Sequence, residues 1–334
     1  MPAIRKWFDF VPNTTGLVRG DQRKFGKVMS AYLKSFAATA ILPFELAYPQ
    51  SHRLYGEAIH RFVDSLREDD SLQSTTDRAP TNPSLDDCTH PATRMVLADL
   101  LQSQLPPISE LMNDGQYRLP KDYPLQRILH FTAPLALLDA AVTYNLKKSD
   151  AGVRQLYVAQ APLNDLPKEL QDDLPVPRIV KTAGKGDIYD SSVWLGLEPT
   201  YTPLHRDPNP NLFIQLCGNK VVRLLPPASG GQIFRDVQLR LNNNFANSRL
   251  RGPEMMSGPE RELMYGAVWY EDGLRGTQAP QGAVEEYQDP SRSKMQEARL
   301  QPGDALFIPK GWWHSVKSED DAGRLNASVN WWFR

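Results

Sequence analysis

The sequence predicts a mainly β protein with α-helices, in which a helical N-terminal part packs on a β-sandwich or barrel. Two observations support this order of elements. In the first part of the chain, apolar residues recur at spacings of three and four, which is typical of helices with one buried face. Short apolar runs separated by turn residues follow, and these are typical of strands. With 334 residues, 41% of them hydrophobic, the chain is long enough for one large domain with an appendage or for two domains.

The N-terminal part is expected to be helical over residues 21–66, because apolar residues keep the helical period on both sides of an interruption. Pro43 and Pro49 mark that interruption, since proline removes a helical hydrogen bond. The remaining segments up to residue 134 are expected as a polar loop over 68–92, a short helix over 95–105 and a loop over 113–127.

The C-terminal part begins with residues 135–144, whose alanine-rich apolar composition favours a helix, although a strand through residues 142–144 stays open. Residues 164–174 predict a short acidic helix or turn. Strands are expected over residues 153–160, 193–197, 212–216, 221–225, 300–309 and 325–333.

Two connections in this part have a predicted structure. Gly218-Asn219 lies between two short apolar strands, so a β-hairpin with its turn at these residues is expected. Residues 228–298 form a long insertion with weak periodicity. Because a structureless loop of that length is unusual inside a compact domain, we expect the insertion to carry some structure or to act as a lid.

Composition excludes some classes of function and favours a reducing compartment. The formal net charge of −1 provides no global basic field, so strong non-specific binding to nucleic acid is not expected. Cys88 and Cys217 form no spaced motif, which favours the cytoplasm or nucleus over a disulfide-built secreted domain. No apolar run is long enough for a membrane helix, and no secretory signal is evident. Residues 1–34 are mildly basic, so a mitochondrial presequence stays open.

Two histidines and one carboxylate form the strongest candidate site. His205 and Asp207 are two residues apart, and on a strand such residues point to the same face. His314 lies far downstream and can supply a third ligand. Two histidines and one carboxylate on one face make the facial triad of non-haem Fe(II) oxygenases, which leaves open positions for a bidentate cosubstrate and O2. The alternative for His314 is a histidine packed beside core tryptophans.

Several other polar residues lie near this motif in the sequence. Lys220, across the predicted hairpin, can pair with the distal carboxylate of a dicarboxylic cosubstrate, or it can be a solvated turn lysine. Thr202 and Asn211 offer a hydroxyl and an amide, although both residue types are common in turns. Asn330 lies in the last strand, where it can steady a metal-bound cosubstrate or simply occupy an edge.

Together these residues resemble the JmjC/cupin-like Fe(II)- and 2-oxoglutarate-dependent oxygenases. The branch with the closest pattern includes the factor-inhibiting-HIF asparaginyl hydroxylase and the wybutosine-pathway hydroxylase. The matching motifs are Tyr157-Val-Ala-Gln160, Thr202-x-x-His205-x-Asp207, Asn211-Leu-Phe-Ile-Gln215, Gly218-x-Lys220, Leu225-Pro-Pro227, Pro302-Gly-Asp through Trp-Trp-His314, and Ser328-Val-Asn-x-Trp332.

The resemblance implies a double-stranded β-helix, the jelly-roll or cupin fold, over residues 135–334, preceded by a helical region over residues 1–134 that carries no family motif. It also implies roles for single residues, with Fe(II), 2-oxoglutarate and O2 as cofactor and cosubstrates. His205, Asp207 and His314 would ligate Fe(II). Tyr157, Thr202 and Lys220 would hold the C5 carboxylate of 2-oxoglutarate, and Asn211 and Asn330 would line its pocket.

The expected function is therefore that of a 2-oxoglutarate-dependent dioxygenase, foremost a hydroxylase of a protein side chain, a modified RNA base or a small molecule. N-methyl-lysine demethylation by the same chemistry is an alternative, and a non-catalytic cupin-like interaction module is another. The substrate is open, and a homodimer is an open prediction. Residues 228–298 contain arginines and aromatic residues, so we expect the insertion to form part of the substrate wall at the iron-side mouth of the barrel.

Overall fold

A computed structural model describes residues 1–11, 26–48, 53–68, 90–105, 112–113, 116–117, 127–147, 152–242, 256, 258–273 and 293–334. The helices are α1 (Ala3–Lys6), α2 (Ala31–Lys34), α3 (Arg53–Arg67), α4 (Pro91–Gln104), α5 (Ala136–Lys147), the 3-10 helix η4 (Leu163–Asp165), α6 (Lys168–Asp172), α7 (Arg178–Thr182), α8 (Pro227–Arg240) and α9 (Gly258–Gly273). The strands are β1 (Phe8–Val11), β2 (Gly26–Met29), β3 (Ile41–Tyr48), β4 (Met112–Asn113), β5 (Gln116–Tyr117), β6 (Arg127–Pro134), β7 (Leu156–Pro162), β8 (Ile188–Leu197), β9 (Tyr201–Arg206), β10 (Asn211–Cys217), β11 (Lys220–Leu225), β12 (Gln296–Leu300), β13 (Ala305–Ile308), β14 (Trp313–Ser318) and β15 (Leu325–Phe333).

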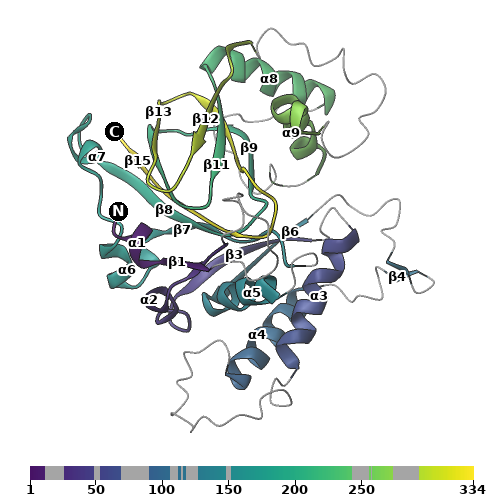
Figure 1. Cartoon of the computed structure of the whole chain (residues 1–334). Coiled ribbons are helices and arrows are strands. Elements are labelled where there is room, and N and C mark those ends of the chain that lie inside the picture. Colours follow the sequence, from purple (N-terminus) through teal and green to yellow (C-terminus); the bar gives the residue numbers. More distant parts are fainter. Residues whose placement is uncertain are drawn as a thin grey trace, which may run out of the picture.

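Two antiparallel sheets form the centre of the molecule (Figure 1). The larger sheet has seven strands in the order β13-β10-β15-β8-β7-β3-β6, and the smaller has four in the order β12-β11-β14-β9. Consecutive strands such as β8 and β9, or β10 and β11, belong to different sheets, as in a jelly roll. The predicted double-stranded β-helix, mainly β with several helices, is confirmed.

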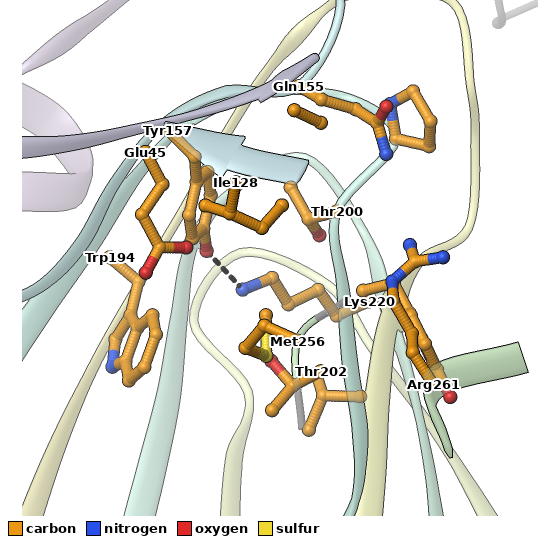
Figure 2. Close-up of a pocket in the computed structure, with 14 residues that line it drawn as sticks. Glu45, Ile128, Gln155, Tyr157, Trp194, Thr200, Thr202, Lys220, Met256 and Arg261 are labelled. Atoms are coloured by element: carbon orange, nitrogen blue, oxygen red, sulfur yellow. Dashed lines mark hydrogen bonds between the residues drawn. The ribbon is translucent and has the colours of Figure 1, made fainter. Parts of the chain in front are cut away.

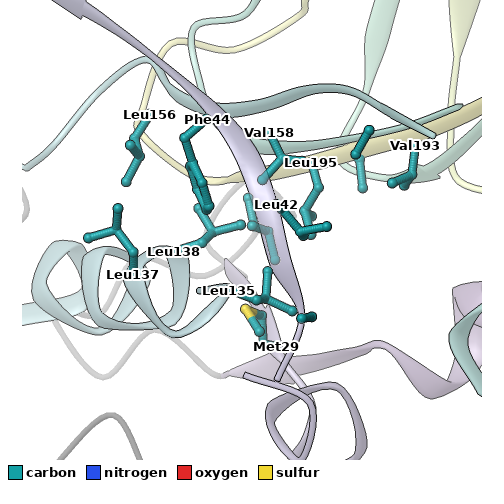
Figure 3. Close-up of a cluster of buried hydrophobic side chains, with 14 of the residues drawn as sticks. Met29, Leu42, Phe44, Leu135, Leu137, Leu138, Leu156, Val158, Val193 and Leu195 are labelled. Carbon is teal, nitrogen blue, oxygen red and sulfur yellow. The ribbon is translucent and has the colours of Figure 1, made fainter. Parts of the chain in front are cut away.

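The outer face of the seven-stranded sheet is covered by helix α5, which follows β6 after a tight connection. Period-two alternation turns Leu42 and Phe44 of β3 toward this helix, where they meet Leu138 (Figure 3). Val193 and Leu195 of β8 extend the same buried layer. The opposite face of the sheet is therefore left to line the interior between the two sheets.

The N-terminal region is less helical than predicted. Residues 26–29 form β2, which pairs with β1, and residues 41–48 form β3, so the predicted helix over 21–66 is wrong in both places. The second half of that prediction is confirmed by α3, in which Ile59, Phe62 and Val63 bury one face. Strands β3 and β6 add two strands at one edge of the seven-stranded sheet. Residues 1–134 therefore contribute directly to the β core and do not form a purely helical region.

Further predictions in this part of the chain are partly testable. The predicted short helix is confirmed as α4, which begins earlier than expected because Pro91 occupies its first turn and His90 caps it. Residues 142–144 are helical, within α5. Of the predicted loops, residues 69–89 and most of 113–127 lie outside the described residues.

The predicted hairpin at Gly218-Asn219 is wrong. β10 pairs with β13 and β15, whereas β11 pairs with β12 and β14, so the turn carries the chain from one sheet to the other. Gly218 has a φ of +66°, which glycine adopts without steric cost. The local signal identifies the turn correctly, but it cannot tell a paired hairpin from a crossing between sheets.

The insertion carries structure, as expected, in the form of α8 and α9. Both helices pack on the outer face of the four-stranded sheet, where Phe234 and Trp269 meet Leu204, Val221 and Trp313 (Figure 1). The prediction that the insertion forms part of the substrate wall at the iron-side mouth stays a prediction, because these two helices are only part of the insertion. Residues 243–255 and 274–292 of the insertion lie outside the described residues. Within the described ranges, no helix is both long and apolar enough to cross a lipid bilayer.

Candidate metal and cosubstrate site

The structure brings His205, Asp207 and His314 together at the end of the four-stranded sheet. His205 on β9 lies directly opposite His314 on β14, because these strands are antiparallel neighbours. One ligand atom from each of the three residues lies within 4.8 Å of the others. The Nε2 atoms of His205 and His314 are 3.8 and 3.5 Å from the carboxylate oxygens of Asp207. Two imidazoles and one carboxylate thus converge from two strands and the loop that follows β9.

Backbone carbonyls fix which nitrogen of each histidine faces the centre. Nδ1 of His205 lies 2.8 Å from the carbonyl oxygen of Pro203, and Nδ1 of His314 lies 3.4 Å from that of Trp312. A carbonyl oxygen only accepts hydrogen bonds, so each Nδ1 carries the proton and donates it. Each Nε2 therefore keeps its lone pair, as a metal ligand requires.

Burial and the neighbouring polar groups together set the charges of the triad. The environment lowers the pKa of His314 to about 4, chiefly because burial disfavours the imidazolium and also because His205 lies close by. Burial alone would raise the pKa of Asp207, but the two histidines and hydrogen bonds from Trp332 and Asn211 outweigh it, so the pKa is lowered. A neutral imidazole and an ionised carboxylate are the protonation states that bind a divalent first-row metal, so this donor set fits Fe(II).

Asn211 and Asn330 are both buried in the interior, yet they contact different groups. Asn211 donates a hydrogen bond from Nδ2 to Asp207 Oδ2 at 2.8 Å and so orients that carboxylate, while its own Oδ1 is buried without a partner among the described residues. Asn330 accepts a 2.7 Å hydrogen bond from Trp194 Nε1. Neither asparagine lines the cavity described next, although Trp194 does.

Lys220 lies at the centre of a second group of residues, deeper between the sheets. Its ammonium donates hydrogen bonds to Tyr157 Oη at 3.0 Å and to Ser328 Oγ at 2.9 Å (Figure 2 shows the bond to Tyr157). Tyr157, Thr202 and Lys220, to which the family resemblance assigns the C5 carboxylate, line one cavity. Gly196 on the neighbouring strand leaves room for the Tyr157 ring, since a Cβ there would lie 2.4 Å from Cδ2 of the ring.

Lys220 is 4% exposed, and burial lowers the pKa of its ammonium to about 7. Burial also raises the pKa of Tyr157 strongly, so its hydroxyl stays protonated and can donate. Within the part of the chain that the structure describes, no carboxylate forms an ion pair with Lys220. A buried ammonium that has only hydroxyl partners fits the carboxylate of a dicarboxylic acid.

Sequence reasoning missed two residues of this cavity region. Ser328 belongs to a motif that matches the family, but no role was predicted for it. Its contact with Lys220 follows only from the fold, because Ser328 and Lys220 are far apart in sequence. Glu45 comes from β3, which the sequence assigned to a helical segment, and it lines the cavity beside Tyr157 (Figure 2). Burial raises the pKa of Glu45, although His130, whose Nδ1 lies 3.6 Å from its carboxylate, acts in the opposite direction.

The fold and the triad define a cupin-like protein with a candidate metal centre, and comparison with known families agrees. The model of the family described as "Cupin-like domain" matches residues 111–334, so the chain belongs to this JmjC/cupin-like family. The match begins ahead of the domain boundary that we predicted at residue 135, and it includes β6.

Curated relatives share about half of this chain. They include lysine-specific demethylase JMJ30 of Arabidopsis thaliana, 28% identical over 177 residues that cover 53% of this chain and 33% of that protein. Lysine-specific demethylase 8 of Danio rerio is 28% identical over 179 residues, or 53% of this chain and 36% of that protein. Jumonji C domain-containing protein 5 of Drosophila melanogaster is 26% identical over 192 residues, or 57% and 39%. The chain thus matches little more than a third of each relative's length.

Proposed function

We propose that this protein is an Fe(II)- and 2-oxoglutarate-dependent dioxygenase. The observation that carries the proposal is the arrangement of the triad: two Nε2 lone pairs and the Asp207 carboxylate share one small space. The Lys220 cavity supports it, because that cavity offers a buried cation for the far end of a dicarboxylate. A non-catalytic module is a weaker alternative, since a protein without chemistry has no need of an intact three-ligand set.

In this proposal His205, Asp207 and His314 hold Fe(II), and Lys220, Tyr157 and Thr202 hold the C5 carboxylate of 2-oxoglutarate. When bound, the metal and cosubstrate supply oxygen activation, which couples conversion of 2-oxoglutarate to succinate and CO2 with insertion of one oxygen atom into a substrate C–H bond. Asn211 keeps the Asp207 carboxylate turned toward the histidines. The buried Trp332, which hydrogen-bonds to Asp207, helps to exclude water from the reacting groups.

Two reactions use this chemistry, and they differ in the C–H bond that is attacked. Hydroxylation of a carbon leaves a stable alcohol on a protein side chain, RNA base or small molecule. Oxidation of an N-methyl group gives an unstable N-hydroxymethyl group, which releases formaldehyde and leaves the demethylated amine. The names of two of the relatives reported above, both lysine-specific demethylases, favour N-methyl-lysine demethylation over the hydroxylation that the sequence led us to expect.

Mass spectrometry of candidate substrates tests both the function and the choice between reactions. Full-length protein with Fe(II), 2-oxoglutarate and ascorbate would be incubated with methylated and unmethylated peptides, tRNA and metabolites. Hydroxylation adds one oxygen atom to the substrate, whereas demethylation removes one CH2 unit and produces formaldehyde. The Asp207→Ala variant is the control. Products that form equally with this variant would contradict the proposed function.

The proposed site also bears on compartment. Ferrous iron persists in a reducing environment, and Cys217 is a buried free thiol. We therefore propose the cytoplasm or nucleus as the place of action. A homodimer stays a prediction, to be tested by the mass of the protein in solution.

A further inference from the structure

The cavity that holds Lys220 extends to a side away from the metal triad. None of the three triad residues is among its lining residues, but Gln155, Thr200 and Arg261 are. A surface groove adjoins the cavity, and both hollows are lined by Gln155, Pro199, Thr200, Tyr201 and Arg261. These shared residues therefore lie between the solvent and the proposed site of the C5 carboxylate.

Arg261 provides a cation at this boundary. It is half-buried, it projects from the first turn of α9, and its Cζ lies 4.9 Å from the centroid of the Tyr201 ring. Among the described residues its guanidinium forms no hydrogen bond or ion pair, although Glu262 follows it in the chain and lines the groove. Burial lowers the pKa of Arg261, which is consistent with a guanidinium that lacks a close anion. A guanidinium with free donors is well suited to a carboxylate.

Thr200 provides a second unused polar group at the same place. The residue is 9% exposed, and its Oγ1 is buried without a hydrogen-bond partner among the described residues. Its backbone is held firmly, because Thr200 N donates to Ser318 Oγ at 3.0 Å and Thr200 O accepts from Ser318 N. A buried hydroxyl without a partner is costly, so a ligand that accepts its hydrogen bond is favoured there.

Helix α9 fixes the position of Arg261. Trp269 on this helix donates a hydrogen bond from Nε1 to Ser315 Oγ at 2.9 Å, next to the metal-ligand candidate His314. Arg223 and Lys317 lie over the Trp269 ring, at 4.4 and 4.8 Å from its centroid. The helix is kinked at Trp269, but Met264 and Val268, on the Arg261 side of the kink, are buried in the same cluster against the four-stranded sheet. Arg261 is therefore presented to the cavity by a packed helix rather than by a free loop.

We propose that Arg261 and Thr200 form an outer carboxylate-binding site at the entrance of the cosubstrate cavity. This inference rests on the proposed function. A dicarboxylate entering from the groove meets Arg261 first, and its distal carboxylate then passes to Lys220, Tyr157 and Ser328. The coproduct, which is also a dicarboxylate, leaves by the same residues. The groove outside this entrance is also lined by Glu262, Glu319, Asp320 and Asp321. Glu319 is paired with Arg299 and Asp320 with Arg324. Arg261 offsets the repulsion that the remaining carboxylates exert on an entering dianion, and this speeds association.

Rapid-mixing kinetics tests the site directly. The probe is N-oxalylglycine, an unreactive dicarboxylate shaped like 2-oxoglutarate, binding to the full-length Mn(II)-loaded protein and followed by tryptophan fluorescence. Arg261→Gln should lower the association rate constant about 10-fold at low ionic strength and flatten its salt dependence. The dissociation rate constant should fall as well, because the exit route is also altered. Arg261→Lys should restore most of the rate, and Thr200→Val should show a smaller loss.

Arg235→Gln is the matched control, because Arg235 is an exposed arginine of the other insertion helix, α8. An association rate constant for Arg261→Gln that equals that of wild type and of the control would overturn the entrance site. A faster dissociation with unchanged association would also overturn it, since Arg261 would then hold the bound ligand instead. Failure of the wild-type protein to bind N-oxalylglycine at all would instead refute the proposed function.

Discussion

Lys220 is the residue whose replacement most sharply separates cosubstrate binding from metal binding. Lys220→Met should raise the dissociation constant for 2-oxoglutarate by about 30-fold or more, because losing one partner of a buried charged pair costs roughly 2–5 kcal/mol. Metal affinity should stay close to that of wild type, since Lys220 contacts no triad residue. Isothermal titration of 2-oxoglutarate into the metal-loaded protein measures the first, and titration of metal into the metal-free protein measures the second. Lys310→Met, at an exposed lysine, serves as the control.

The lowered pKa of Lys220 predicts how cosubstrate binding depends on pH. In the free protein, burial brings this pKa to about 7, so the ammonium is increasingly lost as the pH rises above that value. A bound carboxylate favours the ammonium and raises the pKa in the complex. Affinity should therefore be highest below the free-state pKa and fall by up to about tenfold per pH unit above it, with uptake of a proton on binding. Titrations in buffers of different ionisation enthalpy measure that proton, and a pH-independent affinity would show that another group anchors the carboxylate.

Replacing Asn211 tests whether its hydrogen bond orients the carboxylate of Asp207 for metal binding. Asn211→Leu keeps the approximate volume but removes the 2.8 Å hydrogen bond to Asp207. Loss of such an orienting partner typically lowers metal affinity about 10–100-fold. Competition with a metal chelator gives the affinity, and thermal unfolding without metal checks the fold. An unchanged affinity would mean that Asp207 is held by its other neighbours.

At the scale of elements, helix α8 depends on a close approach to the strand that carries His314. A Cβ added at Gly230 would lie 2.3 Å from Cγ of Trp313, whereas one at Gly231 would lie 3.5 Å or more from its neighbours. Gly230→Ala should therefore destabilise the protein by about 1–3 kcal/mol through overpacking. Gly231→Ala should stabilise it by up to about 1 kcal/mol through helix propensity. Urea unfolding of the two variants measures the difference, and equal stabilities would contradict this packing.

Helix α3 and strand β3 show why some elements could be predicted from the sequence and others could not. The α3 helix carries a long and regular apolar period, so its local signal was sufficient. β3 contains Pro43, which we interpreted as a helix break; in the sheet Pro43 faces Thr132 of β6 and lies just beyond the part of β3 that pairs with β7. The missing N–H of proline is thus tolerated there, an arrangement that only the assembled sheet reveals.

At the scale of the whole molecule, the jelly roll gathers residues that no local pattern connects. His205 and Asp207 could be predicted as a pair because they are two residues apart, although Asp207 lies in the loop just after β9 and not in the strand itself. His314 could be predicted because its motif resembles a known family. Ser328 and Arg261 could not be predicted in this way. Ser328 reaches Lys220 across the two sheets, and Arg261 reaches the cavity only because an insertion helix is anchored on the outer sheet by Trp269. Long-range packing, rather than residue type, defines their positions.

The central claim is that the triad binds Fe(II) and that 2-oxoglutarate binds beside it, as a chelate of the metal. An anaerobic absorption titration tests both parts at once. A 2-oxo acid that chelates Fe(II) produces a visible charge-transfer band, so no knowledge of the substrate is needed. Wild-type protein should give a saturable band at one equivalent of Fe(II). The band should be lost in Asp207→Ala and should require far more 2-oxoglutarate in Lys220→Met. Absence of the band in wild type, or an undiminished band in Asp207→Ala, would contradict the account.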